Sequence, residues 1–271
     1  MKLGAIVLTP EVPSDSNMMA FTGSLNKILP ILKGYGYSGV EFITVDPKQI
    51  DVAEIKHLLA RYELEPIAIN TGPLNKLYGY SLTDPDPEKR SSAISRMKEI
   101  LNFAANWNIP VNCGILRGQF LPRVPQELTV SLLIQSLKEL CDFASQFETK
   151  ILIETVPFMM TNFINTLAEA ETLINSVSCS NLGLMYDIFN MYIEEKDLLA
   201  SIHKYSKSCH HIHFADSNRL APGDGGMDYG KIIKALHEVN YHKYCVVELR
   251  PHPNQEIVTK RAADYLLPLL L

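Results

Sequence analysis

The sequence predicts an α/β fold, a single-domain (β/α)8 TIM barrel that occupies residues 1–271. Eight apolar segments that suit strands alternate with segments of helical periodicity from one end of the chain to the other. Such alternation requires parallel strands joined by right-handed crossovers, and eight of these units close most naturally into a barrel. The competing doubly wound sheet usually has a glycine fingerprint after its first strand, where this chain has TPEVPSDSN.

In the first half of the chain, the expected strands are apolar and β-prone, and the expected helices place apolar residues three and four apart. Residues 2–8 form the first strand, and a loop rich in proline and serine follows at residues 9–17. A long loop that ends at Asp86 follows the third strand, and Pro85 and Pro87 then mark a helix start. The other strands expected here are at residues 40–45, 67–71 and 111–116, and the helices are at residues 21–34, 52–62, 92–107 and 131–147.

The second half continues the alternation. The stretch HHIHFADSNRLAPGDGGMDYG, residues 210–230, indicates a strand, a glycine-rich loop and the start of a helix, because its proline and glycines interrupt any regular element. The strands expected in this half are at residues 150–156, 182–188, 210–216 and 244–249, and the helices are at residues 166–177, 195–205, 229–238 and 255–271.

Composition excludes several classes of partner. The net charge is −5 and the isoelectric point is near 5.9, so the chain has no basic field for nucleic acid or an anionic membrane. No run approaches the roughly 20 apolar residues of a membrane span. Five cysteines without paired spacing indicate reduced thiols, and the short apolar N-terminus suits a strand better than a secretory signal. We therefore expect a cytoplasmic protein with a small-molecule partner, and a homo-oligomer is left open.

Four consecutive expected strands end in a residue that can bind a metal. They are the fifth to the eighth strands, and the residues are Glu154, Asp187, His213 and Glu248. In a barrel these strand ends meet at one rim of the mouth. Three carboxylates so close together would repel one another, and a divalent cation would resolve that conflict. With neutral His213 and a divalent ion, the set would carry −3 + 2 = −1.

Three carboxylates and one imidazole form a mostly hard ligand shell. Such a shell suits Mn²⁺, Mg²⁺ or Co²⁺, and Zn²⁺ also fits. If each residue binds through one atom, octahedral coordination leaves two adjacent positions for a carbonyl and a neighbouring hydroxyl of a substrate. The carbon–hydrogen bond between those groups would become acidic, and the metal would stabilise the resulting enediolate. This pattern favours chemistry that begins with abstraction of that proton.

Several motifs resemble the xylose isomerase-like barrel superfamily, and within it the sugar isomerases and epimerases. They are IETVP, YDIFNM, HIHFADSNR followed by PGDGGMD, and VVELRP. The group includes ketose 3-epimerases, inosose isomerases and hydroxypyruvate isomerase. The resemblance covers the whole chain in topology and is specific from Glu154 onward. It implies a metal-dependent isomerase or epimerase of a sugar or polyol-derived ketone, with metal ligands at Glu154, Asp187, His213 and Glu248.

The resemblance also implies individual roles. In ketose 3-epimerases the two glutamate ligands exchange protons with opposite faces of the substrate carbon, which implies that Glu154 and Glu248 are catalytic. An arginine six residues after the metal histidine binds substrate there, and Arg219 has that position. Two positions depart from the pattern. Asn190 replaces a histidine that contacts substrate, and Met160 replaces a glutamate.

Three other functions remain open at this stage. A lyase that dehydrates a keto-inositol would use the same enolisation and then expel a hydroxyl group. An endonuclease-type member of the superfamily would need a multi-zinc cluster and a basic face, whereas strands two to four offer no ligand histidine and the net charge is negative. A non-catalytic member of the superfamily is the remaining alternative, and the complete four-residue set argues against it.

Weaker candidates lie around this set. Glu41 at the end of the second strand suits a structural role beside the site better than a catalytic one. His211 shares one strand face with His213, so it could support the site from behind, contact substrate or pack in the core, and we favour the last two roles. Arg117 suits a surface ion pair or an anion contact, while Cys113 and Trp107 suit core packing.

The glycine-rich loop also invites a functional interpretation. Gly223, Gly225 and Gly226 could cradle a phosphate, but their spacing is not that of a P-loop. We therefore expect this loop to cover the substrate.

Overall fold

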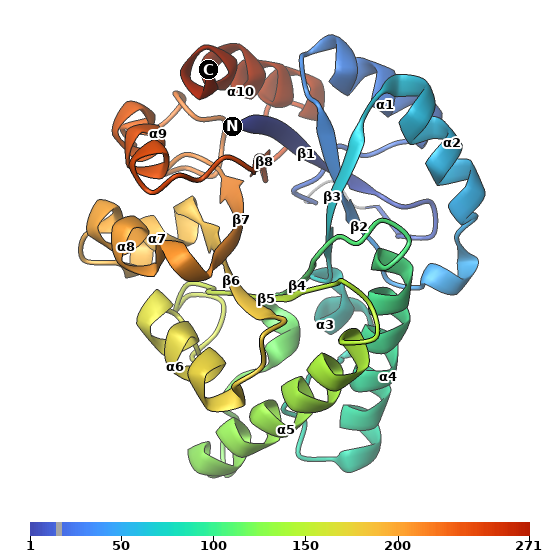
Figure 1. Cartoon of the computed structure of the whole chain (residues 1–271), viewed down its shortest axis with the longest axis vertical. Coiled ribbons are helices and arrows are strands. Elements are labelled where there is room, and N and C mark those ends of the chain that lie inside the picture. The colour runs from blue at the N-terminus through green and yellow to red at the C-terminus, as the bar shows by residue number, and fades with distance from the viewer. Residues whose placement is uncertain (15–17) are drawn as a thin grey trace.

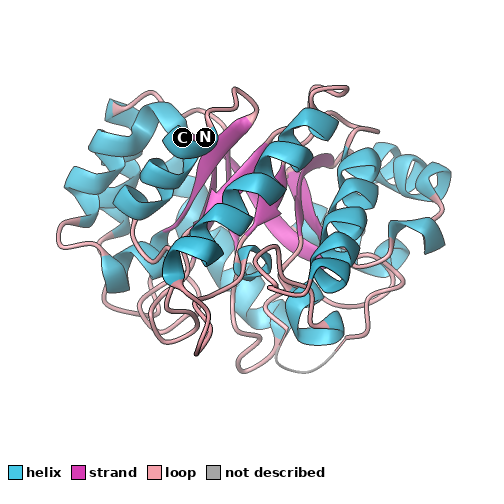
Figure 2. Cartoon of the chain, turned by 90° about the horizontal axis from the view of Figure 1, so that it is seen from below, coloured by secondary structure: helices cyan, strands magenta, loops and turns pink. Residues whose placement is uncertain are grey.

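The computed structural model describes residues 1–14 and 18–271 and forms a closed parallel barrel. The strands β1 to β8 hydrogen-bond in sequence order, and β8 closes the barrel by pairing with β1. Helices surround the strands on the outside (Figure 1), and a view turned by 90° shows the strands enclosed between them (Figure 2). The predicted (β/α)8 fold is confirmed.

The strands are short and almost entirely buried, which explains their continuous apolar character. Their bounds are β1 Lys2–Leu8, β2 Gly39–Ile43, β3 Glu65–Asn70, β4 Val111–Cys113, β5 Ile151–Glu154, β6 Leu182–Asp187, β7 Cys209–Phe214 and β8 Tyr244–Val247. A parallel sheet covered by helices on its outer face and filled by side chains inside leaves no strand face for water. All eight predicted strands are therefore present, with ends that shift by a few residues.

Most of the helices form the outer layer (Figure 1) and bury one apolar face, whereas the short α3 buries only Leu74. Their bounds are α1 Leu25–Gly34, α2 Val52–Tyr62, α3 Pro73–Tyr78, α4 Pro87–Ala104, α5 Gln126–Ala144, α6 Leu167–Val177, α7 Ile188–Glu194, α8 Leu198–Tyr205, α9 Tyr229–Glu238 and α10 Gln255–Leu270. Polar residues mark several helix starts, as in α6, where Thr166 and Glu169 form a capping box. None of the helices in the described ranges is long and apolar enough to cross a lipid bilayer.

Two predictions in the first half of the chain need correction. The helix expected from residue 21 begins at Leu25, because Phe21 instead forms a bridge with Val7 of β1. The long segment expected as a loop after β3 contains the short helix α3, whose first turn begins with Pro73. Of the loop expected at residues 9–17, residues 15–17 lie outside the described residues.

A further helix appears directly after β6. Asp187 ends the strand and also caps α7, because its side chain accepts a hydrogen bond from the backbone N–H of Asn190. The expected helix at residues 195–205 is therefore preceded by α7 and begins only at Leu198. The immediate turn into α7 holds Asp187 and Asn190 close to one another at the barrel mouth.

The predicted environment of Arg117 needs correction, and its observed contacts bear on the stability of the fold. Neither the predicted surface ion pair nor the predicted anion contact is present, because Arg117 is fully buried at 0% exposure. Its guanidinium group donates to the backbone oxygens of Gly114, Phe163 and Ile164, at 2.7 Å each. It therefore ties the segment after β4 to the segment after β5.

Replacing Arg117 with methionine should lower the free energy of unfolding by at least about 3 kcal/mol. The change keeps an unbranched apolar stem but leaves three buried carbonyl groups without their donor, and each such loss costs about 1–3 kcal/mol. Denaturant unfolding of both proteins measures the difference. The matched change Arg61→Met, on the exposed surface of α2, should alter stability by less than about 0.5 kcal/mol. Equal losses in the two variants would contradict this role.

Candidate metal and active site

The four residues predicted as metal ligands meet at the carboxyl end of the barrel. Glu154 and Asp187 are the last residues of β5 and β6, His213 lies near the end of β7, and Glu248 directly follows β8. Each offers one ligand atom, and these atoms all lie within 4.8 Å of one another. The sequence placed these side chains at strand ends, and barrel closure brings them to one point.

Two amide side chains hold Glu154. Asn112 of β4 donates from Nδ2 to Glu154 Oε2 at 2.8 Å, and Asn190 of α7 donates to Glu154 Oε1 at 3.4 Å. Gly114 allows this close approach, because a Cβ atom there would lie 2.6 Å from Glu154 Oε2. Burial and the neighbouring Glu248 carboxylate raise the pKa of Glu154 to about 7.

Arg219 is the cation of this cluster. Its guanidinium group forms ion pairs with both oxygens of Asp187, at 2.8 Å each, and also with Glu248. Its Nε donates to the sulfur of Met19 at 3.4 Å, and its guanidinium carbon lies 4.7 Å from the centre of the Phe189 ring. Although burial acts to raise the pKa of Asp187, Arg219 outweighs it and holds that pKa below its ordinary value.

The backbone of Arg219 is fixed as firmly as its side chain. Arg219 adopts a left-handed conformation with φ of 62°, which is uncommon for a residue with a side chain. Its N–H donates to the oxygen of Asp216, and its own oxygen accepts from the N–H of Arg250, both at 2.8 Å. The turn after β7 therefore aims the guanidinium group into the mouth.

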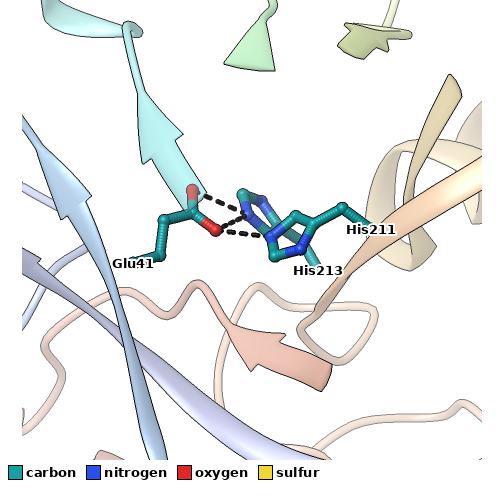
Figure 3. A group of neighbouring side chains, drawn as sticks. All are labelled: Glu41, His211 and His213. Carbon is teal, nitrogen blue, oxygen red and sulfur yellow. Dashed lines mark hydrogen bonds and ion pairs between the residues drawn. The ribbon is translucent and has the colours of Figure 1, made fainter. Parts of the chain in front are cut away.

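His213 is held from behind by Glu41 of β2 (Figure 3). His213 Nε2 lies 2.9 Å from Glu41 Oε2, and His211 Nε2 lies 2.5 Å from the same oxygen. Burial alone would raise the pKa of Glu41, but His213 and His211 outweigh it and hold that pKa well below its ordinary value. The interpretation of Glu41 as a residue beside the site agrees with this position.

The donor set fits a divalent metal ion. His213 Nδ1 is buried, lies 3.6 Å from Glu248 Oε2, and has no hydrogen-bond partner among the described residues. A buried polar atom without a partner is unusual, and here it faces the carboxylates. Three carboxylates and a free imidazole nitrogen within one small region are a set of oxygen and nitrogen ligands suited to Mn²⁺, Mg²⁺, Co²⁺ or Zn²⁺.

A cavity of about 800 Å³ opens beside this cluster. Four site residues line it, namely Glu154, Glu248, Asn190 and Arg219. Its other walls combine apolar side chains with polar and basic ones, including Met19, Met160, Ile115, Phe189, Lys76, Arg250 and His252. This volume lies within the range of small-molecule sites, so the mouth can receive a sugar-sized ligand.

The expected substrate contact of His211 does not agree with this geometry. His211 is only 2% exposed and does not line the cavity, because its ring turns toward Glu41. The packed position agrees with this geometry, as does a place behind the site next to Glu41, and the substrate contact does not.

The glycine-rich loop does not cover the cavity. The N–H groups of Gly223 and Met227 donate to the side chain of Asp216, at 2.8 and 3.0 Å, and that of Gly226 donates to Ser217 Oγ at 2.9 Å. These donors are therefore engaged within the loop, and none of its glycines lines the cavity.

Comparison with known proteins identifies the family of this barrel and several similar enzymes. The sequence model of the family described as xylose isomerase-like TIM barrel matches residues 29–269. The chain belongs to the xylose isomerase-like TIM barrel family. It is 26% identical to a probable ketose 3-epimerase from Synechocystis sp. over 84% of this chain and 79% of the relative. It is also 26% identical to hydroxypyruvate isomerase from Escherichia coli, over 82% of this chain and 86% of the relative.

Solved structures share the fold of this xylose isomerase-like barrel. The structure of D-allulose 3-epimerase from Methylomonas sp. superposes with a TM-score of 0.81, covers 99% of this chain and 98% of its own, and is 19% identical. At that identity the likeness concerns the fold alone. It agrees with the closed barrel described above.

The two departures from the epimerase pattern can now be located in this xylose isomerase-like barrel. Asn190 donates to the oxygen of Thr155 at 2.9 Å in addition to Glu154, so it supports the ligand set as well as lining the cavity. Met160 lies on the cavity wall and is 56% exposed. An amide and a thioether therefore occupy positions where the resemblance led us to expect a histidine and a carboxylate.

Sequence reasoning missed several residues of this site. Asn112 could have been noticed, because it is the polar residue in the short buried strand β4. Met19, Phe189 and Arg250 gave no such signal, since they lie in loops or on a short helix. Cys113 is buried, and Trp107 stacks on Phe42 with ring centres 6.3 Å apart, so both expected packing roles agree with the structure.

Proposed function

We propose that this protein is a divalent-metal-dependent isomerase or epimerase of a sugar or polyol-derived ketone. The observation that supports it is the convergence of Glu154, Asp187, His213 and Glu248 beside a cavity of about 800 Å³. The relatives are named for epimerisation of a ketose and isomerisation of hydroxypyruvate, and the family membership supports the same reaction class here.

Glu154, Asp187, His213 and Glu248 would hold the metal. When bound, a divalent ion would polarise the substrate carbonyl and stabilise the negative charge that develops beside it. Mn²⁺, Mg²⁺, Co²⁺ and Zn²⁺ all fit the donor types, and metal analysis of the purified protein would identify the ion that it binds.

In the proposed reaction, Glu154 and Glu248 move protons. One carboxylate takes the proton from the carbon next to the carbonyl, and the electron pair of that bond moves into the carbonyl system to give an enediolate. The other carboxylate, once protonated, returns a proton to the opposite face, so a ketose would be epimerised without any oxidant or reductant. Asn112 and Asn190 support this by fixing both oxygens of Glu154.

The remaining residues bind and orient the substrate. Arg219 presents its guanidinium group to the cavity from a fixed turn, and it can donate to substrate oxygens next to Asp187 and Glu248. Asn190 can donate and accept hydrogen bonds but cannot titrate, so it suits recognition and not proton transfer. Apolar walls such as Phe189 and Ile115 would pack against the carbon face of the ligand.

The test measures the first chemical step without assuming a product. We expect metal-dependent exchange of one carbon-bound hydrogen for deuterium when the Mn²⁺-loaded protein is incubated in D₂O with a panel of ketoses and inososes. Nuclear magnetic resonance of the recovered compound detects the exchange and any new epimer. The chelated protein is the control. Product formation without exchange, or equal exchange with and without metal, would contradict the proposal.

A further inference from the structure

One carboxylate in the barrel interior faces two imidazole rings (Figure 3). Glu41 is 0% exposed, and its Oε2 lies 2.5 Å from His211 Nε2 and 2.9 Å from His213 Nε2. Its Oε1 lies 3.1 Å from the same nitrogen of His213. His211 comes from β7, like His213, while Glu41 comes from β2 on the other side of the barrel.

These contacts select one tautomer of His213. An ionised carboxylate only accepts hydrogen bonds, so each Nε2 that faces Glu41 must carry a hydrogen. In the neutral ring the lone pair of His213 then lies on Nδ1. That atom faces Glu248 at 3.6 Å and has no hydrogen-bond partner among the residues that the structure describes. The ring is therefore set in the form and the direction that a metal ligand needs.

We propose that Glu41 is a positioning residue of the metal site, which fixes the orientation and tautomer of His213, and that His211 acts behind it by fixing Glu41. Neither residue lines the cavity, so neither contacts the substrate. The inference rests on the proposed metal site and adds two residues that determine its affinity. A carboxylate behind a ligand histidine also makes that ring a better donor to the metal.

Glu41, His211 and His213 could instead form a second cation site, since their ligand atoms also lie within 4.8 Å of one another. The distances favour hydrogen bonds. Ligands at about 2.0–2.2 Å from a tetrahedral ion lie about 3.4 Å apart, whereas His211 Nε2 and Glu41 Oε2 are separated by 2.5 Å. We therefore expect one divalent ion per chain and not two.

The first variant is Glu41→Gln, which keeps the size of the side chain. A glutamine carries no charge, and whichever way its amide is turned, its NH2 group faces the N–H of His213 Nε2, where Glu41 offers a carboxylate oxygen. We expect Mn²⁺ to bind about 10- to 100-fold more weakly, which is the usual loss when a partner behind a ligand is removed. Calorimetric titration of the metal-free protein with Mn²⁺ measures this affinity and the stoichiometry without any substrate.

Variants of His211 test whether this residue acts on His213 through Glu41. His211→Leu should weaken Mn²⁺ binding less than Glu41→Gln does, because His211 acts only through Glu41. His211→Gln, which restores a donor toward Glu41, should recover part of the loss. In the double variant Glu41→Gln/His211→Leu, the affinity should match that of Glu41→Gln alone, since coupled residues are not additive. This series also keeps the proposal testable if Glu41→Gln fails to fold.

The control is Ser136→Ala, which removes a buried hydrogen bond to the oxygen of Leu82, outside the cluster. It should lower the melting temperature and leave Mn²⁺ affinity unchanged. If Glu41→Gln lowers the melting temperature but binds Mn²⁺ like the unaltered protein, Glu41 is merely structural. A second Mn²⁺ per chain that disappears in Glu41→Gln would also overturn the proposal. Failure of the unaltered protein to bind any divalent ion would instead contradict the proposed function.

Discussion

Changing Glu248 to glutamine should lower turnover by at least about 10²-fold, and by up to about 10⁴-fold, even when the metal site is filled. Glutamine keeps an oxygen that can still approach the metal but has no carboxylate to accept a proton. The variant also leaves Arg219 with one carboxylate partner fewer, because Arg219 forms ion pairs with both Glu248 and Asp187. Initial rates on a substrate identified by deuterium exchange, at saturating Mn²⁺, measure the loss.

Glu154→Gln should have a similar effect, because an epimerase needs one carboxylate on each face of the carbon. One of the two variants should still exchange a substrate hydrogen with D₂O while it forms no epimer. Glu139→Gln is the matched control, since Glu139 is exposed on α5 and pairs with Lys98 across the surface. Near-normal turnover by Glu248→Gln with a filled site would show that the two-glutamate mechanism is wrong.

Divalent metal should raise the melting temperature of the protein by about 5 °C or more. An ion that binds only the folded site at about 100 times its dissociation constant adds about 2.7 kcal/mol to the free energy of unfolding. For a chain of this size, each kcal/mol shifts the melting temperature by about 2–4 °C. The physical source is the relief of repulsion among Glu154, Asp187 and Glu248, which lie within one cluster.

The ligand variants should lose this stabilisation. His213→Ala and Asp187→Asn should each reduce the metal-induced shift, measured by differential scanning calorimetry with Mn²⁺ and with chelator. Glu65→Gln is the matched control, because it removes a carboxylate that pairs with Lys2 at the exposed opposite end of the barrel. It should keep the full shift. Equal melting temperatures with and without metal for the unaltered protein would count against the metal site.

The order of the elements could be predicted from the sequence because the signals are local. Continuous apolar runs mark strands that are buried on both faces, and a spacing of three and four marks helices with one buried face. Helices Val52–Tyr62 and Tyr229–Glu238 have the bounds that these patterns predict. The missed helices α3 and α7 are only one or two turns long, too short for a periodic pattern.

The cluster of four candidate ligands could also be predicted from the sequence, because the ends of all the strands of a barrel meet at one mouth. A charged residue at the end of a buried strand lies at the mouth whichever strand carries it. This reasoning located Glu154, Asp187, His213 and Glu248. It failed for Arg117, since the residue follows a strand in the same way but turns inward to three backbone oxygens.

The sequence by itself therefore determined the barrel and the four side chains that converge at its mouth, through periodicity and strand ends. Only the tertiary structure decided which groups support them. Glu41 lies 170 residues from His211 in the chain, and Asn112 lies 42 residues from Glu154, yet each pair is in hydrogen-bond contact. The pairing of Arg219 with Glu248 likewise joins two different loops. Asn112 and Glu154 meet because β4 pairs with β5, and the contact of Glu41 with His211 needs closure of the barrel, so no local pattern of residues encodes either one.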